Sequence, residues 1–330
     1  KFQKSISCMK DFCIVGSGVA GSTIANLLAK KYSIDILDKA RGPGGRASNR
    51  RYKNKLSFDH GLQYISPKSN NFKKFIIRLN KKKILKEWTG NHLDFTFEKK
   101  KLLIKYIGTK GNNDICKNLL TNIEKKFNTH VKKIVFKKNY WEVSTINNTK
   151  FLYKNLVLTF PFPQMKNIAK RYINNKLKNL DVRMLPNITI MAVYKSKKII
   201  PISSIKFNNR ILGWASNENS KKRFNSNLNL WTIQTNYSWA QKNINKYKNN
   251  KLKTKNIILK EFCKLTGLNN KDKIFSSIHG WKYSYNKKQT KMQSYFSKKF
   301  KLGICGDWFL GPKAEHAWLS ANDLFKKIRL

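Results

Sequence analysis

The chain has 330 residues, of which 40% are hydrophobic and 12% aromatic, a composition that excludes a disordered or fibrous protein. Lys and Arg number 69 against 17 Asp and Glu, and the resulting formal net charge of +52 points to anionic partners. No run of 18 apolar residues occurs, so no membrane-spanning helix is predicted.

The first forty residues have the pattern of a nucleotide-binding unit. The apolar run at 12–15 is typical of a buried parallel strand, and it leads directly into Gly-Ser-Gly-Val-Ala-Gly at 16–21. A helical pattern continues to Leu28, and a second apolar strand at 34–37 ends at Asp38. This order of strand, glycine turn, helix, strand and acid predicts a dinucleotide-binding βαβ unit.

The residues of this motif have separate physical roles. Gly16 permits the tight turn, Gly18 lets the backbone approach a pyrophosphate, and Gly21 lets helix and strand pack closely. The helix N-terminus offers N–H groups and a positive dipole end to the phosphates. Asp38, which stands 22 positions after Gly16, can accept hydrogen bonds from a ribose diol. The motif alone does not distinguish NAD from FAD.

A second glycine motif follows shortly after Asp38. Gly44 and Gly45 stand beside Arg46, whose guanidinium can form paired hydrogen bonds with phosphate oxygens. The sequence Phe-Asp-His-Gly-Leu-Gln-Tyr then occupies 58–64. Taken separately, these segments are typical of a surface loop and a strand-end turn. After a dinucleotide motif, the glycine pair favours a second close approach to a phosphate-rich cofactor.

Helical and strand-like patterns alternate along the rest of the chain. The helices that apolar spacing predicts cover 70–86, 112–127 and 313–328. The strands that alternation or short apolar runs predict cover 88–97, 131–136, 140–144, 150–153, 155–160, 188–194, 211–215, 228–235 and 302–305.

These elements predict an α/β protein with a discontinuous Rossmann-like domain and a mixed sheet-and-helix substrate domain. The Rossmann-like domain is expected to comprise 9–80, 100–164 and 296–330. The substrate domain is expected to comprise 81–99 and 165–295.

Three segments together resemble the renalase-like flavoproteins, a branch of the amine-oxidase class of FAD enzymes. These segments are RGPGGRASNRR at 41–51, FDHGLQY at 58–64 and GICGDWFLGPKAEHAWLSA at 303–321. The runs at 106–115 and 281–283 also match family positions, so the resemblance spans the chain. It implies non-covalently bound FAD in an amine-oxidase-like two-domain architecture.

The resemblance assigns the first glycine motif to the ADP half of FAD, the Gly44–Arg46 segment to the length of the cofactor, and the loop after Asp59 to the flavin. Gly306 and Asp307 match a strand-end motif that binds the ribityl and phosphate region. The predicted cofactor-binding residues are Gly16, Ser17, Gly18, Ala20, Gly21, Asp38, Lys39, Gly44, Gly45, Arg46, Ala47, His60, Gly61, Gln63, Val131, Gly306, Asp307, Glu315, His316 and Ala317.

The chain departs from the family pattern at two of these positions. Ala47 stands where family members usually carry Met, and His316 follows Glu315 where Gly is common. The helix that begins here is expected near the flavin pyrimidine. We therefore expect His316 to alter the redox potential or to block part of the site.

The resemblance implies hydride transfer to flavin N5 from a dihydronicotinamide-type substrate, an isomer of NADH or NADPH, with reoxidation by O2 to H2O2. No strong general base is required, because the substrate ring becomes aromatic as the hydride leaves. His60 and Tyr64 are the candidates for a role near the flavin. The candidate substrate residues, for which core packing is the rival interpretation, are Tyr64, Trp214, His279 and Trp281.

Two other functions stay open. The first is another flavoenzyme of the same fold that acts on an amine or an isoprenoid-like substrate. The second is a basic, non-catalytic flavin module that binds nucleic acid or an anionic membrane. The Lys residues are spread along the chain among many Asn and Ile residues, which favours compositional drift over a specific nucleic-acid partner. The oligomeric state is not predicted.

The cysteine spacing and the N-terminal sequence indicate the cellular compartment in which the protein is expected. Five cysteines, far apart and without a CxxC pair, argue against a disulfide framework or a zinc site, and no other cluster has metal-ligand spacing. Cys13 and Cys305 lie in predicted strands, where we expect core packing. A reducing, cytoplasmic location fits this pattern. Lys and Asp interrupt the N-terminal region, so no signal peptide is predicted, and Met9 is a hypothetical start.

Overall fold

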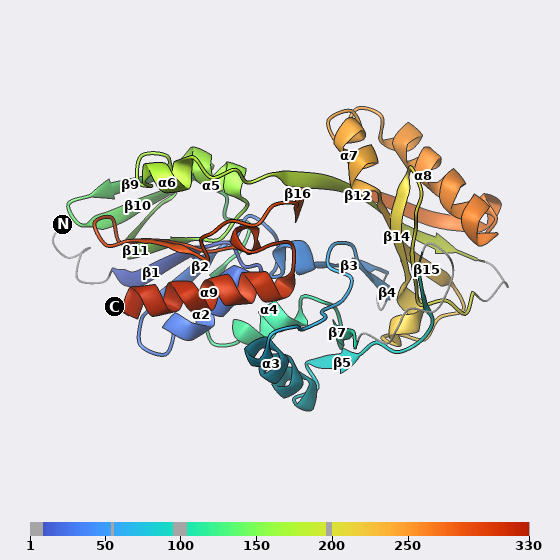
Figure 1. Cartoon of the computed structure of the whole chain (residues 1–330), viewed down its shortest axis with the longest axis horizontal. Helices are drawn as coiled ribbons and strands as arrows, with labels where there is room; N and C mark the ends of the chain where they lie inside the picture. Colours follow the sequence, from blue (N-terminus) through green and yellow to red (C-terminus); the bar gives the residue numbers. More distant parts are fainter. Residues whose placement is uncertain (1–8, 54–55, 95–103, 196–199, 330) are drawn as a thin grey trace.

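The computed structural model describes residues 9–53, 56–94, 104–195 and 200–329, which form an elongated molecule with a β-sheet toward each end (Figure 1). The first sheet has a parallel part in the order β18-β11-β1-β2-β8. Its strands are β1 (Lys10–Val15), β2 (Ile34–Leu37), β8 (Glu124–Lys126), β11 (Lys150–Leu158) and β18 (Leu302–Ile304). Antiparallel neighbours extend it, namely β17 (Tyr295–Ser297), β10 (Tyr140–Thr145) and β9 (Val131–Lys137).

The apolar character of β1 follows from its central place. Cys13 and Ile14 point to opposite faces and both are fully buried, because packed layers cover the sheet on each side. One layer contains α2 (Val19–Leu28), α3 (Asn70–Lys81), α4 (Asp114–Leu119) and α9 (Ala314–Arg329). On the other face, α5 (Phe162–Ala169) and α6 (Asn175–Lys178) pack together with the antiparallel extension β9–β10.

The second sheet has the order β16-β12-β15-β14-β13-β6. Its strands are β6 (His92–Leu93), β12 (Met184–Tyr194), β13 (Ser204–Lys206), β14 (Leu212–Asn217), β15 (Asn229–Thr235) and β16 (Lys273–Asn286). The helices α7 (Tyr237–Asn243) and α8 (Lys251–Thr266) cover one face, where Trp231, Ile258 and Phe262 pack in a separate core. Between the two sheets lie the hairpin β3 (Asn49–Tyr52) and β4 (Leu56–Asp59) and the pair β5 (Leu85–Glu87) and β7 (Tyr106–Gly108) (Figure 1).

The two helices predicted at 70–86 and 112–127 are too long. The first ends at Lys81, because Lys83 adopts a left-handed φ of 57° before β5 begins. The second ends at Leu119, and its predicted C-terminal half instead contains β8, which pairs in parallel with β2. Leu120 and Ile123 are still buried in the core of this domain, but the chain leaves the helix after Leu119, and Glu124–Lys126 pair with Asp35–Leu37 at the edge of the sheet.

Three strand predictions also differ from the structure. The expected strands at 150–153 and 155–160 are one strand, β11, whose first half pairs with β10 and whose second half pairs with β1. The strand expected at 88–97 is replaced by β5 and the short β6, and residues 95–97 lie outside the described ranges. The long strand β16 was not predicted, because polar residues, a glycine and aromatic residues are mixed along it.

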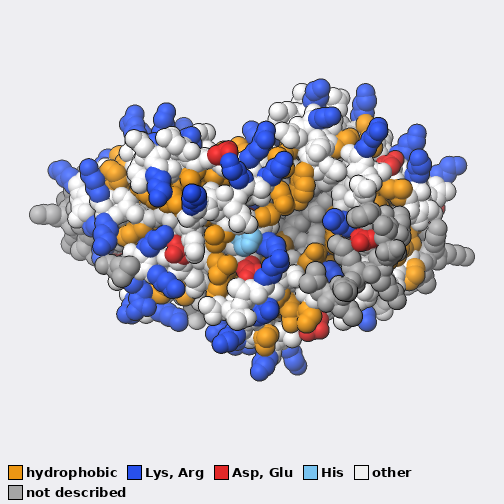
Figure 2. Space-filling model, in the orientation of Figure 1, with side chains coloured by type: hydrophobic (Ala, Val, Ile, Leu, Met, Phe, Trp, Pro, Cys, Tyr) orange, Lys and Arg blue, Asp and Glu red, His pale blue; other side chains and the backbone are white. Residues whose placement is uncertain are grey.

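The described cysteines are free, and Cys13 and Cys305 are fully buried, which confirms their expected core packing. Burial raises the pKa of the Cys116 thiol to about 12. Cys8 lies outside the described residues. Within the described ranges, no helix combines the length and the apolar character that crossing a membrane requires. Lys and Arg are scattered over the face shown in Figure 2 rather than gathered into one stripe.

Candidate active site

A large cavity of about 2650 Å³ lies between the two sheets. Its wall includes both glycine motifs, the loop after β4, the N-terminal end of α9 and the segment of β16 from His279 to Tyr285. A pocket for one small ligand usually measures about 300–1,000 Å³, so this cavity has room for an extended dinucleotide and a second molecule beside it.

The first glycine turn forms a cradle with space where a phosphate is expected. A Cβ on Gly16 would lie 2.5 Å from Thr159 Oγ1, and one on Gly21 would lie 1.9 Å from the Gly16 oxygen, so neither position tolerates a side chain. Gly18 differs, because the nearest atom to its added Cβ is the Gly44 oxygen at 3.8 Å. Gly18 precedes α2 without a side-chain cap, which leaves first-turn N–H groups available to an anion.

Asp38, which was predicted to bind a ribose, is held in place by hydrogen bonds from the first glycine turn. It accepts hydrogen bonds from the Ser17 N–H at 2.7 Å, the Ser17 hydroxyl at 2.6 Å and the Ala40 N–H at 2.8 Å. A carboxylate offers about four acceptor positions, so about one stays available to a ribose hydroxyl. Ser17 itself does not line the cavity; it fixes the orientation of Asp38.

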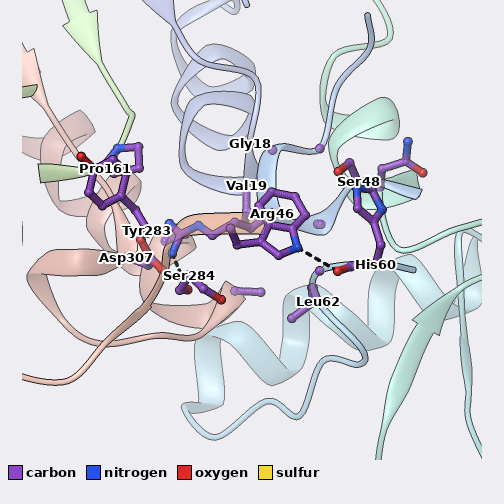
Figure 3. Close-up of a pocket in the computed structure, with 18 of the residues that line it drawn as sticks. Gly18, Val19, Arg46, Ser48, His60, Leu62, Pro161, Tyr283, Ser284 and Asp307 are labelled. Carbon is purple, nitrogen blue, oxygen red and sulfur yellow. Dashed lines mark hydrogen bonds and ion pairs between the residues drawn. The ribbon is translucent and has the colours of Figure 1, made fainter. Parts of the chain in front are cut away.

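The second glycine segment lies directly against the first. Gly44 and Gly45 have φ values of 135° and 52°, a region of backbone conformation that favours glycine. The Gly44 N–H donates to the Ser17 carbonyl at 2.9 Å, which ties the two segments together. In Figure 3, Gly18 and Val19 lie on one side of the Arg46 side chain. The two motifs thus form a continuous wall.

Arg46 is engaged within the protein. Its guanidinium donates to Asp307 at 2.5 Å and to the Ser284 carbonyl at 3.2 Å (Figure 3). The side chain keeps about a third of its exposure, so a ligand can reach the same ion pair. Sequence reasoning gave Arg46 and Asp307 separate contacts with a cofactor; the structure joins them across the cavity.

The start of α9 is arranged differently from the expectation for His316. Glu315 lines the cavity, but its carboxylate accepts the backbone N–H groups of Lys68 at 2.9 Å and Ser69 at 2.7 Å. The His316 ring is turned toward Gly311, where an added Cβ would lie 2.7 Å from its Nδ1 atom, and His316 is not part of the cavity wall. The expectation that His316 obstructs the site is therefore not met by this geometry.

An aromatic cluster forms the wall on the side of the second sheet. The ring centroids of His60 and His279 are 5.1 Å apart, and those of His279 and Trp281 are 4.3 Å apart. The Trp281 indole donates to the His60 carbonyl at 2.9 Å (Figure 3). Burial lowers the pKa of His60 to about 4, and burial also lowers that of His279, so both rings are neutral near pH 7.

The residues of β16 from His279 to Tyr285 continue this wall, and Tyr283 and Tyr285 are among them. The pairing of β16 with β12 is irregular between Trp281 and Tyr285, and residues of both alternating sets line the cavity there. Tyr285 packs against Tyr237 with ring centroids 4.6 Å apart. Sequence analysis missed these tyrosines, although the aromatic residue at every second position from 279 to 285 was a usable signal.

Tyr64 and Trp214 line the cavity as a second aromatic pair, with ring centroids 5.7 Å apart. Burial raises the pKa of the Tyr64 hydroxyl. Sequence reasoning considered each of these residues as a pocket wall or a core residue, and the structure places both at the cavity surface.

Four charged residues beneath the loop after β4 form a buried network. Lys221 Nζ lies 2.9 Å from Asp59 Oδ2 and 2.9 Å from Glu218 Oε2, and all three side chains are 0% exposed. Arg223 pairs with the same Asp59 carboxylate. Gln63 joins this network to the cavity, because it accepts the Ser216 hydroxyl at 2.7 Å. The network fixes the loop that carries His60 against the second sheet.

The cavity brings together nearly all the residues that sequence reasoning selected. Those on its wall are Gly16, Gly18, Ala20, Asp38, Lys39, Gly44, Gly45, Arg46, Ala47, His60, Gly61, Gln63, Tyr64, Val131, Trp214, His279, Trp281, Gly306, Asp307, Glu315 and Ala317. Ser17, Gly21 and His316 are not on it. The wall also contains residues that were not selected, among them Arg50, Gln234, Tyr237, Lys282, Tyr283 and Tyr285.

Residues 14–79 match the family of NAD(P)-binding Rossmann-like domains. Among solved structures, the chain is similar to a protein of Exiguobacterium sp. 255-15 provisionally named a protoporphyrinogen oxidase, with a TM-score of 0.74, 10% identity, and coverage of 97% of this chain and 98% of that one. It is also similar to a single-substitution variant of putrescine oxidase, with a TM-score of 0.70, 9% identity, and coverage of 97% and 99%. The chain therefore has the two-domain amine-oxidase fold, which confirms the predicted fold class.

Proposed function

We propose that the protein is an FAD-dependent oxidoreductase of renalase-like type that oxidises a dihydronicotinamide-type substrate. The observation that carries this proposal is the continuity of one cavity from the α2 N-terminus, past the Arg46–Asp307 pair, to the aromatic wall of β16. A dinucleotide with a planar ring at its far end suits that shape. The likeness in fold to the two oxidases supports a redox reaction.

The proposal assigns a task to each part of the cavity. The α2 N-terminus and Gly18 would bind the pyrophosphate, Asp38 a ribose hydroxyl, and Arg46 with Asp307 the middle of the cofactor. When bound, FAD would supply a hydride acceptor at N5, and the two electrons would pass with two protons to O2 to form H2O2. Tyr64, Trp214 and Trp281 would hold the planar substrate ring and exclude water.

The neutral histidines are consistent with such a substrate. A dihydronicotinamide ring needs no strong base, because loss of the hydride makes it aromatic. His60 and His279 would then position the substrate without taking a proton from carbon. We further propose the domain division 9–80, 100–164 and 296–330 against 81–99 and 165–295, and a reducing, cytoplasmic location.

Anaerobic reduction tests this function. The FAD-loaded protein is mixed without O2 with NADH isomers generated by borohydride, and the blue-light absorption band of the oxidised flavin is followed. We expect rapid bleaching, and stoichiometric H2O2 after O2 is admitted. Persistence of the band with these isomers, together with bleaching by an amine, would contradict the proposal.

An amine substrate is the second candidate, because one structural neighbour is putrescine oxidase. The described acids on the cavity wall are Asp38, Asp307 and Glu315. Each of them is already hydrogen-bonded within the protein and lies on the nucleotide side. Among the described residues, the aromatic wall on the side of the second sheet thus offers no carboxylate to a cationic amine. This favours the nicotinamide-type substrate. Putrescine in the same anaerobic assay distinguishes the two.

A further inference from the structure

Three basic side chains lie on the cavity wall; the scheme above gives Arg50 no task and does not say which part of the substrate His60 and His279 position. Arg50 lies on β3 and is exposed, His60 follows β4, and His279 lies on β16. The two imidazole rings are perpendicular, with centroids 5.1 Å apart. The positive charge of Arg50 is near enough to add to the effect of burial in lowering the pKa of both histidines. Three nitrogen bases from separate elements thus converge.

No available counter-charge accompanies this cluster among the described residues of the cavity wall. The three acids of the wall have partners on the nucleotide side, as described above. Asp59 is adjacent to His60 and raises its pKa, but its carboxylate is buried and paired with Lys221 and Arg223. The cluster therefore lacks an anion. Arg50 carries its fixed positive charge, and the two imidazoles beside it become positive when protonated, so a ligand of negative charge suits the site.

His60 supplies an independent sign of an incomplete site. Its side chain is 8% exposed, and its buried Nδ1 atom has no hydrogen-bond partner among the described residues. Buried polar atoms are nearly always hydrogen-bonded, so an orphan at a cavity wall calls for an explanation. Because the Nδ1 atom is buried, a group bound in the cavity would reach it only after the ring turns; such a group would also account for Arg50.

We propose that Arg50, His60 and His279 bind a phosphate group of the substrate, and that the two histidines take up protons as it binds. This inference rests on the proposed function, in which a phosphate-bearing substrate shares the cavity with FAD. The cofactor phosphates are assigned to the α2 N-terminus, so this cluster is a second anion site. A guanidinium fork and two imidazolium N–H groups match the oxygens of a phosphate.

The pH dependence follows from the charges that face the two rings. Arg50 and the neighbouring histidine oppose protonation of His60, Asp59 favours it weakly, and Arg50 opposes protonation of His279. A bound dianion reverses this balance and raises both pKa values. Anion binding is therefore accompanied by proton uptake and becomes tighter as the pH falls.

Sulfate is the suitable probe, because its charge is constant between pH 5.5 and 8. Binding to the FAD-loaded protein is measured by calorimetry in two buffers of different ionisation enthalpy, which yields the number of protons taken up. We expect at least about tenfold tighter binding at pH 5.5 than at pH 8 and net proton uptake. Sulfate should also raise the KM of the nicotinamide substrate and leave kcat unchanged.

Single substitutions test whether sulfate binding and proton uptake arise at this cluster. Arg50→Gln should weaken sulfate binding about tenfold or more, and His279→Gln should reduce the proton uptake. Arg210→Gln is the matched control, because Arg210 is exposed and does not line the cavity. All three positions are at least partly exposed, and bound FAD content verifies that each variant is folded.

The outcomes separate this inference from the proposed function. Sulfate binding that is independent of pH, or equal losses in the Arg50 and Arg210 variants, would overturn the anion site even if nicotinamide isomers bleach the flavin. Proton-linked sulfate binding in a protein whose flavin those isomers do not reduce would uphold the site and reject the substrate class.

Discussion

At the scale of single residues, the glycines carry the most specific information. Gly16 is required by its φ of 107° and its contact with the Thr159 side chain, and Gly21 by its contact with the Gly16 carbonyl, whereas a Cβ on Gly18 would meet no atom closer than 3.8 Å. Packing alone explains the first two, and it leaves Gly18 unexplained unless a ligand approaches there. This difference provides a test that does not depend on catalysis.

Gly18→Val should therefore abolish or weaken FAD binding by at least about tenfold while the fold persists, because the new side chain projects into the expected phosphate position. Bound flavin per chain and the circular dichroism spectrum measure the two effects. Ala29→Val is the control, since Ala29 is exposed at the opposite end of α2 and does not line the cavity. Equal flavin content in the two variants would show that Gly18 does not face the cofactor.

His60 predicts a pH dependence of stability. Burial is the main cause that lowers its pKa to about 4, so the unfolded chain binds a proton more readily than the folded chain. The folded state should thus lose roughly 3 kcal/mol at His60 as the pH falls from about 7 to 4. Urea unfolding of the flavin-free protein and its His60→Gln variant measures this, and parallel pH curves for the two would contradict it.

At the scale of elements, the βαβ unit could be predicted closely and the substrate sheet could not. The strand at 12–15 and the helix that follows it are buried on the faces that their apolar pattern indicates. By contrast, β16 borders a cavity, and its mixture of polar and aromatic residues hides the usual alternation. The Arg46–Asp307 pair was also out of reach, because it joins residues 261 positions apart.

The loop after β4 and the turn that follows β14 are joined by the buried charges. Lys221→Met would leave Asp59 and Glu218 with less compensation, and loss of one partner from a buried ion pair costs about 3–5 kcal/mol. We expect the free energy of unfolding to fall by about that amount, measured by urea denaturation. Lys242→Met, at an exposed position on α7, should change it little; similar losses in both variants would argue against the network.

At the scale of the whole molecule, two sheets with separate cores lie toward opposite ends (Figure 1). The cavity lies between them. The net charge of +52 is distributed over the visible surface rather than focused on a groove (Figure 2). The informative charges are instead the few that line the cavity, where the described acids are engaged and Arg50 faces two neutral histidines. The overall architecture therefore favours a small anionic substrate over a polyanionic partner.

The identity of the bound cofactor tests the central claim most directly. The purified protein, saturated with FAD and passed through a desalting column, is precipitated with acid, and the released nucleotide is separated and quantified. We predict one FAD per chain in the supernatant and a colourless pellet. A supernatant that contains NAD or NADP in place of FAD, no nucleotide at all, or a pellet that stays yellow would contradict a non-covalent FAD site formed by the two glycine motifs.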